Sequence, residues 1–128
     1  MNMPGKKEAN KETGALGETI ACTFLKKKGY TILERNYRTK QGEVDIVARK
    51  KNIIRFVEVK TVSRENAVSH GYRPEERVHT RKIAKIAHVA LVYMEKKYTD
   101  LDYQIDVIGI LLDKENKTAK CRLFEGVT

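Results

Sequence analysis

The hydrophobic positions of this chain follow two periodicities, one helical and one alternating. Apolar residues recur every three or four positions over residues 15–28, which predicts a helix that ends at Gly29, where a terminating glycine is expected. The same spacing predicts a second helix that begins either near Pro74 or at Thr80. The apolar faces of the two helices comprise Leu16, Ile20, Ala21, Phe24 and Leu25, and then Ile83, Ile86, Ala87, Ala90 and Met94.

Shorter apolar segments are typical of β-strands. They cover residues 30–37, 43–49, 53–61, 104–112 and 120–124, the last of them an edge strand. The polar turn at residues 50–52 is short, so the strands on either side of it are predicted to form an antiparallel hairpin. The order α-β-β-β-α-β-β predicts a single α/β domain with a central mixed β-sheet flanked by helices.

Length and charge are consistent with one basic domain behind a short leader. Residues 1–13 are polar, and we interpret them as a flexible basic leader to a domain that covers residues 14–128. Lys and Arg number 26 against 17 Asp and Glu, which gives a formal net charge of +9. A small domain this basic is expected to attract a polyanion such as nucleic acid, although the charge could serve solubility alone.

Cysteine content and hydropathy predict a cytoplasmic protein without a membrane partner. Cys22 and Cys121 are too few for a disulfide framework, and no CxxC pair suggests zinc. The N-terminal residues lack the apolar segment of a signal peptide. No apolar run approaches the roughly 18 residues needed to cross a bilayer.

Acidic residues inside apolar strand segments are the main candidates for function. Asp45 lies in VDIVA and Glu58 in FVEVK, where burial of an unpaired charge would be costly. Lys60 shares the strand face of Glu58, because side chains two positions apart point the same way. The hairpin is expected to bring Asp45 opposite a position between Phe56 and Glu58, where two carboxylates would repel each other unless a cation lay between them. Oxygen ligands of this kind suit Mg²⁺ or Mn²⁺.

Glu18 is a fourth candidate, from the first predicted helix. On the helical wheel it lies with Ala21, Cys22 and Leu25, inside the apolar arc. A glutamate that faces the sheet needs a partner, and a metal site would provide one.

These four residues suggest a division of roles in phosphodiester chemistry. Asp45 and Glu58 would bind the metal, with Glu18 binding it directly or through water, and the metal would lower the pKa of bound water. Lys60 would orient or deprotonate the attacking water, or stabilise the developing charge. The alternative interpretation is that Glu58 and Lys60 form an exposed pair on an edge strand, with Asp45 in a salt bridge to a nearby arginine.

The same residues lie in motifs that resemble a known family. The motifs are G-x-x-G-E at residues 14–18, K-K-G-Y ending at Tyr30, R-N-Y-R, G-E-V-D-I-V at 42–47 and F-V-E-V-K at 56–60. In these motifs, and nearly throughout the chain beyond the leader, the sequence resembles the UPF0102 family of predicted PD-(D/E)XK nucleases.

That resemblance implies a restriction-endonuclease-like fold, as in archaeal Holliday-junction resolvases. It also implies a site formed by Glu18, Asp45, Glu58 and Lys60, a divalent metal and phosphodiester cleavage. Junction resolvases of this fold work as dimers, so the resemblance allows a homodimer. Thr61 departs from the family, which commonly has an arginine after the motif lysine, and the departure would weaken a phosphate contact.

Three further residues leave alternatives open. Arg81 and Lys82 open the second predicted helix, where basic residues oppose the macrodipole, so they could contact phosphates or simply form a solvated face. Asp106, in an apolar strand segment, could support the metal site or make a structural hydrogen bond.

We therefore expect a metal-dependent endonuclease that acts on DNA, with branched or structured DNA as the leading substrate. The alternatives are a non-catalytic nucleic-acid-binding or adaptor domain that retains the nuclease fold, and a nuclease directed at RNA.

Overall fold

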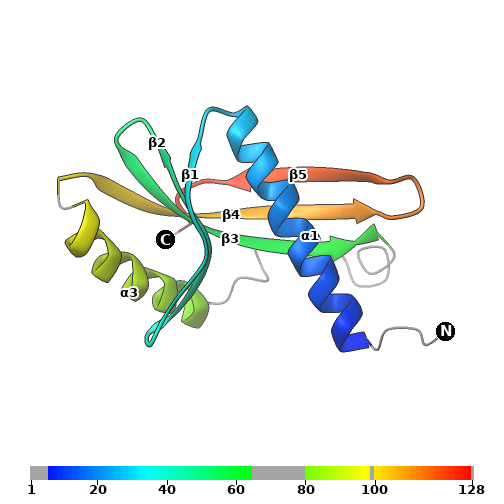
Figure 1. The fold of residues 1–128 in the computed structure, drawn as a ribbon, viewed down its shortest axis with the longest axis horizontal. Helices are drawn as coiled ribbons and strands as arrows, with labels where there is room; N and C mark the ends of the chain where they lie inside the picture. The colour runs from blue at the N-terminus through cyan, green and yellow to red at the C-terminus, as the bar shows by residue number, and fades with distance from the viewer. Residues whose placement is uncertain (1–5, 65–79, 99, 128) are drawn as a thin grey trace.

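The computed structural model describes residues 6–64, 80–98 and 100–127, and its elements follow the predicted order. They are helix α1 (Lys6–Lys27), strands β1 (Thr31–Thr39), β2 (Gly42–Lys50) and β3 (Ile53–Ser63), helix α3 (Thr80–Lys97), and strands β4 (Asp102–Asp113) and β5 (Thr118–Phe124). Figure 1 shows these elements arranged around one central sheet. The predicted single α/β domain with a mixed sheet is confirmed.

The sheet has the strand order β1-β2-β3-β4-β5. Neighbouring strands are antiparallel, except that β3 and β4 run parallel. Helix α3 lies between these two strands in the sequence. The predicted hairpin is confirmed, because Lys50 pairs with Ile53 around a two-residue turn at Lys51 and Asn52. Lys51 has a positive φ of 57°, the conformation that tight hairpin turns require.

The first helix begins at Lys6, earlier than the predicted start at residue 15. The stretch KKEANKE is rich in residues that favour helix, so it can continue the helix without contributing an apolar face. Part of the predicted leader is therefore helical, and its flexibility remains a prediction.

The end of α1 is fixed by Gly29. Gly29 has φ 91°, a left-handed conformation that glycine adopts without steric cost. The backbone N–H of Gly29 donates to the carbonyl of Lys26, and that of Tyr30 donates to the carbonyl of Leu25, both at 3.0 Å. This is the Schellman pattern, which satisfies the last carbonyls of the helix and turns the chain into β1.

Each face of the sheet has its own apolar cluster. Neighbouring residues of β3 face opposite clusters: Val57 packs with the buried face of α1, and Phe56 packs with that of α3. The two helices therefore cover opposite faces of the sheet. Among the described residues no helix is long and apolar enough to cross a membrane.

The buried face of α3 agrees with the prediction, whereas the buried face of α1 differs from it. The predicted face of α3 is confirmed, with Val89 and Tyr93 as additional buried residues. The buried face of α1 is instead centred on Ala21, Cys22 and Leu25, and Leu16 remains 48% exposed. Small side chains let a helix approach a sheet closely, which explains why the larger residues lie at the margin.

Candidate active site

The pairing of β2 with β3 ends where the candidate carboxylates begin. Ile46 and Val57 form the last pair of the ladder, and Asp45 and Glu58 occupy the next position on each strand. The Oδ2 atom of Asp45 accepts a hydrogen bond of 2.8 Å from the backbone N–H of Val59. A side chain therefore occupies the place of a strand–strand hydrogen bond, and Asp45 lies in the fork between the two strands.

Glu58 faces α3 and is nearly inaccessible to solvent. It is 4% exposed, and on the same strand face Phe56 packs into the α3 cluster. Its Oε1 atom lies 2.5 Å from the Nζ atom of Lys82, in the first turn of α3. The side chain of Lys82 is 44% exposed, so this ion pair has a buried anion and a cation at the surface.

Glu18 approaches the same fork from α1. It is half-buried next to Ala21 and Cys22, as its position on the helical wheel predicts. Its carboxyl group interacts with that of Asp45 and with the side chain of Asn36 in β1. Asn36 has φ 50°, a backbone conformation that asparagine tolerates better than most residues. Its two neighbours in β1 pair with the residues on either side of Asp45 in β2.

Gly17 sets the distance between α1 and β3 beside this cluster. A Cβ atom at Gly17 would overlap the Oγ1 atom of Thr61, so only glycine fits this contact. Thr61 thus lies under α1, on the face of β3 opposite to Glu58 and Lys60. The threonine that departs from the family pattern faces the helix rather than the carboxylate–lysine face.

The carboxyl groups perturb one another strongly. Burial, followed by the charge of Glu58, raises the pKa of Asp45 to about 6, although the Val59 N–H and the charge of Lys82 act in the opposite direction. Burial and the charge of Asp45 likewise raise the pKa of Glu18. Glu18, Asp45 and Glu58 thus form an acidic row with Asp45 at its centre: the charge of Glu58 disfavours ionised Asp45, and the charge of Asp45 disfavours ionised Glu18.

Lys82 partly compensates this negative charge. Burial alone would lower its pKa, but the hydrogen bond and the charge of Glu58, together with the charge of Asp45, outweigh burial, so the pKa of Lys82 is raised. One ammonium group thus faces two mutually repelling carboxylates.

Lys60 lies beside this cluster without joining it. It is half-buried and shares the strand face of Glu58, two positions along β3. Within the part of the chain that the structure describes, its ammonium group makes no hydrogen bond or ion pair. Its neighbour in the parallel ladder is Gly109, which has no side chain to cover it. No side chain of the described residues therefore pairs with the Lys60 ammonium.

A basic cavity adjoins the acidic row. Its volume is about 500 Å³, and Lys82, which pairs with Glu58 of the acidic row, belongs to its wall. Arg81 and Lys85 add two exposed positive groups to the wall. The lining residues are Gly42, Glu43, Arg81, Lys82, Lys85 and Ile86.

The donor chemistry of the fork fits a hard divalent cation in part. Asp45 and Glu58 offer carboxylate oxygens from opposed strand positions, and a cation would relieve the repulsion between them. In the described residues, however, no three His, Cys, Asp or Glu side chains are arranged to hold a metal ion together. The described residues thus supply two carboxylates at the fork, with Glu18 next to Asp45 and the Lys82 ammonium on Glu58.

The structure brings together most of the residues that the sequence singles out. Glu18 adjoins Asp45, which adjoins Glu58, and Lys82, for which the sequence leaves a phosphate contact and a solvated face open, binds Glu58. The role of Asn36 was not predicted. Its signal in the sequence is an asparagine inside a strand segment, where this residue type is uncommon.

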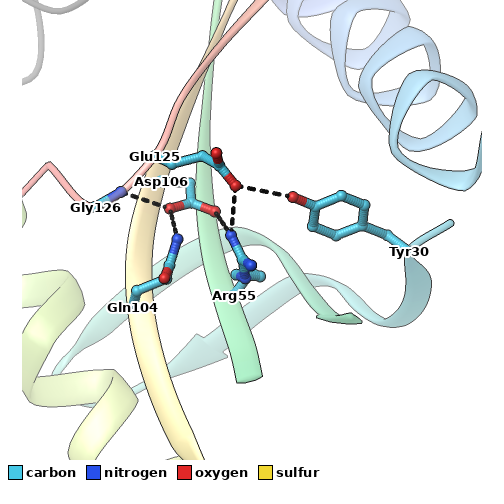
Figure 2. Close-up of polar contacts among 6 residues, drawn as sticks. All are labelled: Tyr30, Arg55, Gln104, Asp106, Glu125 and Gly126. Carbon is cyan, nitrogen blue, oxygen red and sulfur yellow. Dashed lines mark hydrogen bonds and ion pairs between the residues drawn. The ribbon is translucent and has the colours of Figure 1, made fainter. Parts of the chain in front are cut away.

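Asp106 belongs to a polar cluster with Tyr30, Arg55, Gln104, Glu125 and Gly126 (Figure 2). It is fully buried, lies 3.4 Å from Arg55 and accepts a hydrogen bond of 2.8 Å from Gln104. Arg55 also binds Glu125 at 2.7 Å, and Tyr30 donates to the same carboxylate. These contacts tie the C-terminal segment to β3 and β4, so of the two interpretations of Asp106 they favour the structural one.

The fold and this geometry define a small α/β domain with an acidic fork that adjoins a basic cavity. The family model described as uncharacterised protein family UPF0102 matches residues 17–110, a range that contains the whole acidic row and the cavity wall. The chain belongs to the UPF0102 family, as its motifs indicate.

Curated relatives are similar over most of their length. A UPF0102 protein of Clostridium botulinum (strain 657) is 40% identical over 121 residues, which cover 91% of this chain and 93% of the relative. A UPF0102 protein of Campylobacter hominis is 42% identical over 101 residues, which cover 79% and 85% of the two chains. Membership therefore rests on nearly the whole chain and not on the strand motifs alone.

Proposed function

We propose that this protein is a divalent-metal-dependent endonuclease that hydrolyses phosphodiester bonds in DNA, with branched or structured DNA as the preferred substrate. The observation that carries the proposal is the pair of opposed carboxylates, Asp45 and Glu58, at the fork. Burial, followed by the charge of Glu58, raises the pKa of Asp45 to about 6, a destabilising arrangement that a bound cation would relieve. A fold that maintains such repulsion without a ligand gains no stability from it.

The roles of the residues follow from their positions. Asp45 and Glu58 would hold Mg²⁺ or Mn²⁺, and Glu18 would act through Asp45 or through water. A cation held there would supply a Lewis acid for a phosphoryl oxygen. Lys60, on the same strand face as Glu58, would orient the attacking water or stabilise the charge that develops on the phosphate.

The basic cavity supports a nucleic-acid substrate. Arg81 and Lys85 are exposed next to the acidic row, so a backbone phosphate in the cavity would bring the scissile bond near the fork. Contacts of this kind bind any sequence, and their strength falls steeply with salt. A homodimer, which the family resemblance allows, would present two such sites to a branched substrate.

A cleavage panel tests this function. The wild type would be incubated with Mg²⁺ or Mn²⁺ and a four-way junction, a flap, a single strand, a duplex or RNA. Lys60→Ala should keep DNA binding and lose about 100-fold or more in cutting rate, the range expected when a proton-transfer or charge-stabilising group is removed. Lys120→Ala, which removes an exposed lysine from β5, serves as the charge-matched control and should cut normally. Full activity in Lys60→Ala would contradict the catalytic assignment.

Two observations favour the alternative, a non-catalytic nucleic-acid-binding domain. The Lys82 ammonium already neutralises Glu58, and no three metal-ligating side chains converge among the described residues. Under that alternative, the wild type would bind DNA with a steep salt dependence and would cut none of the substrates in the panel.

A further inference from the structure

We infer that Lys82 is an exchangeable cation: its ammonium occupies Glu58 in the free protein and transfers to a backbone phosphate when nucleic acid binds, which frees Glu58 for the divalent metal. The inference rests on the proposed function and concerns the order in which its ligands enter. It begins from the ion pair of 2.5 Å between the Lys82 Nζ atom and the Glu58 Oε1 atom.

The two members of this ion pair differ in their freedom to move. Glu58 is 4% exposed, on the central strand β3, where it pairs with Val107 of β4. Lys82 is in the first turn of α3, and its side chain is 44% exposed. A long, flexible lysine side chain can therefore move its ammonium while the carboxylate remains fixed.

The basic cavity, where the ammonium would bind a phosphate, lies next to the Lys82–Glu58 ion pair. Lys82 lines the basic cavity together with Arg81 and Lys85. A phosphate that enters the cavity offers Lys82 an anion in a more exposed setting, where the two other cations assist binding. An ammonium that binds phosphate no longer neutralises Glu58, so the negative charge at the fork rises when the substrate arrives.

The consequence for metal binding follows from electrostatics. A divalent cation must compete with an ammonium group in direct contact with one of its two carboxylate ligands. Positive charge at this distance weakens cation binding substantially, because the pair is shielded from solvent on the Glu58 side. Metal and nucleic acid should therefore bind cooperatively, and the coupling must be reciprocal.

Isothermal titration with Mn²⁺ tests the inference. All proteins would carry Lys60→Ala so that a 12-base-pair duplex remains uncut, and folding would be checked by thermal melting. Adding Lys82→Met should tighten Mn²⁺ binding roughly 5- to 10-fold without DNA, since the competing charge is gone. The duplex should tighten Mn²⁺ binding several-fold in the Lys60→Ala parent and leave it unchanged in the double variant.

Two controls separate the exchange from general charge effects. Lys85→Met removes the same charge from the same cavity wall but leaves the Glu58 ion pair intact, so its Mn²⁺ affinity should match the parent. Lys82→Arg keeps a cation on Glu58 and should also match the parent. If Lys82→Met does not fold, Lys82→Gln provides the same comparison.

The outcomes distinguish this inference from the proposed function. If Asp45→Asn abolishes Mn²⁺ binding while Lys82→Met leaves the affinity unchanged, the metal site stands and the exchange is refuted. If neither the parent nor the Lys82→Met variant binds Mn²⁺, the metal site is refuted, and with it both the proposed function and the exchange.

Discussion

The acidic row should make the folded protein less stable at neutral pH than a variant that lacks its central charge. Asp45 lies between Glu18 and Glu58, and its pKa is raised from 3.8 to about 6. A group whose folded pKa is raised binds its proton more tightly in the folded state. Its stabilising contribution is therefore complete below about pH 3.8 and is lost as the pH rises through 6.

The magnitude follows from the same pKa values. At 1.36 kcal/mol for each pH unit, the difference between 3.8 and about 6 corresponds to roughly 3 kcal/mol, an upper limit because the carboxyl groups titrate together. Asp45→Asn removes the ionisation and keeps an oxygen that can accept from the Val59 N–H. The free energy of unfolding of the variant should exceed that of the wild type by up to about 3 kcal/mol at pH 8 and by about half as much at pH 5.

Urea unfolding in EDTA at the two pH values measures this difference. Asp113→Asn is the control of opposite sign, because hydrogen bonds from Asn116 lower the pKa of Asp113. Loss of the Asp113 carboxylate should lower the free energy of unfolding more at pH 8 than at low pH. An Asp45→Asn variant that is less stable than the wild type at pH 8, or a gain that does not change with pH, would refute the electrostatic reasoning.

Other predictions concern packing, the buried polar cluster and the cavity. Gly17→Ala should destabilise the protein by about 1–3 kcal/mol in thermal unfolding, because its methyl group overlaps the Thr61 side chain of β3. In the control Gly14→Ala, the methyl group meets no atom within 4 Å, and the free energy of unfolding should rise by up to about 1 kcal/mol. Asp106→Ala should cost about 3–5 kcal/mol by urea unfolding, because it leaves a buried arginine without a buried partner, and its cleavage rate per folded molecule should be unchanged. Arg81→Ala and Lys85→Ala should each reduce the slope of log affinity for duplex against log salt by about 1, and an unchanged slope would show that the cavity does not bind phosphate.

The carboxylate pair could be predicted from the sequence because local rules determine it. A two-residue turn and alternating side chains fix the register of a hairpin, and a shift of one residue would turn every side chain to the other face. This reasoning places Asp45 close to Glu58, and in the observed register the two residues directly follow the last pair of the ladder, Ile46 and Val57. The helical spacing placed Glu18 on the buried side of α1 in the same way.

Contacts between distant segments could not be predicted. The Lys82–Glu58 pair depends on where α3 packs after the crossover, and no local pattern gives that position. Arg55 binds Glu125, which is 70 residues away in the sequence, because the C-terminal segment lies alongside β4. The early start of α1 was missed for a different reason, since its first turns form without an apolar face to signal them.

The most direct test of the metal-dependent site is to locate the metal. Crystals soaked in Mn²⁺ and measured at a wavelength where manganese scatters anomalously should show a peak between Asp45 and Glu58, about 2.1–2.2 Å from an oxygen of each. The Lys82 ammonium should have left Glu58 in the same crystals. An anomalous map without a peak at the fork, with Lys82 still on Glu58 at saturating Mn²⁺, would contradict the account.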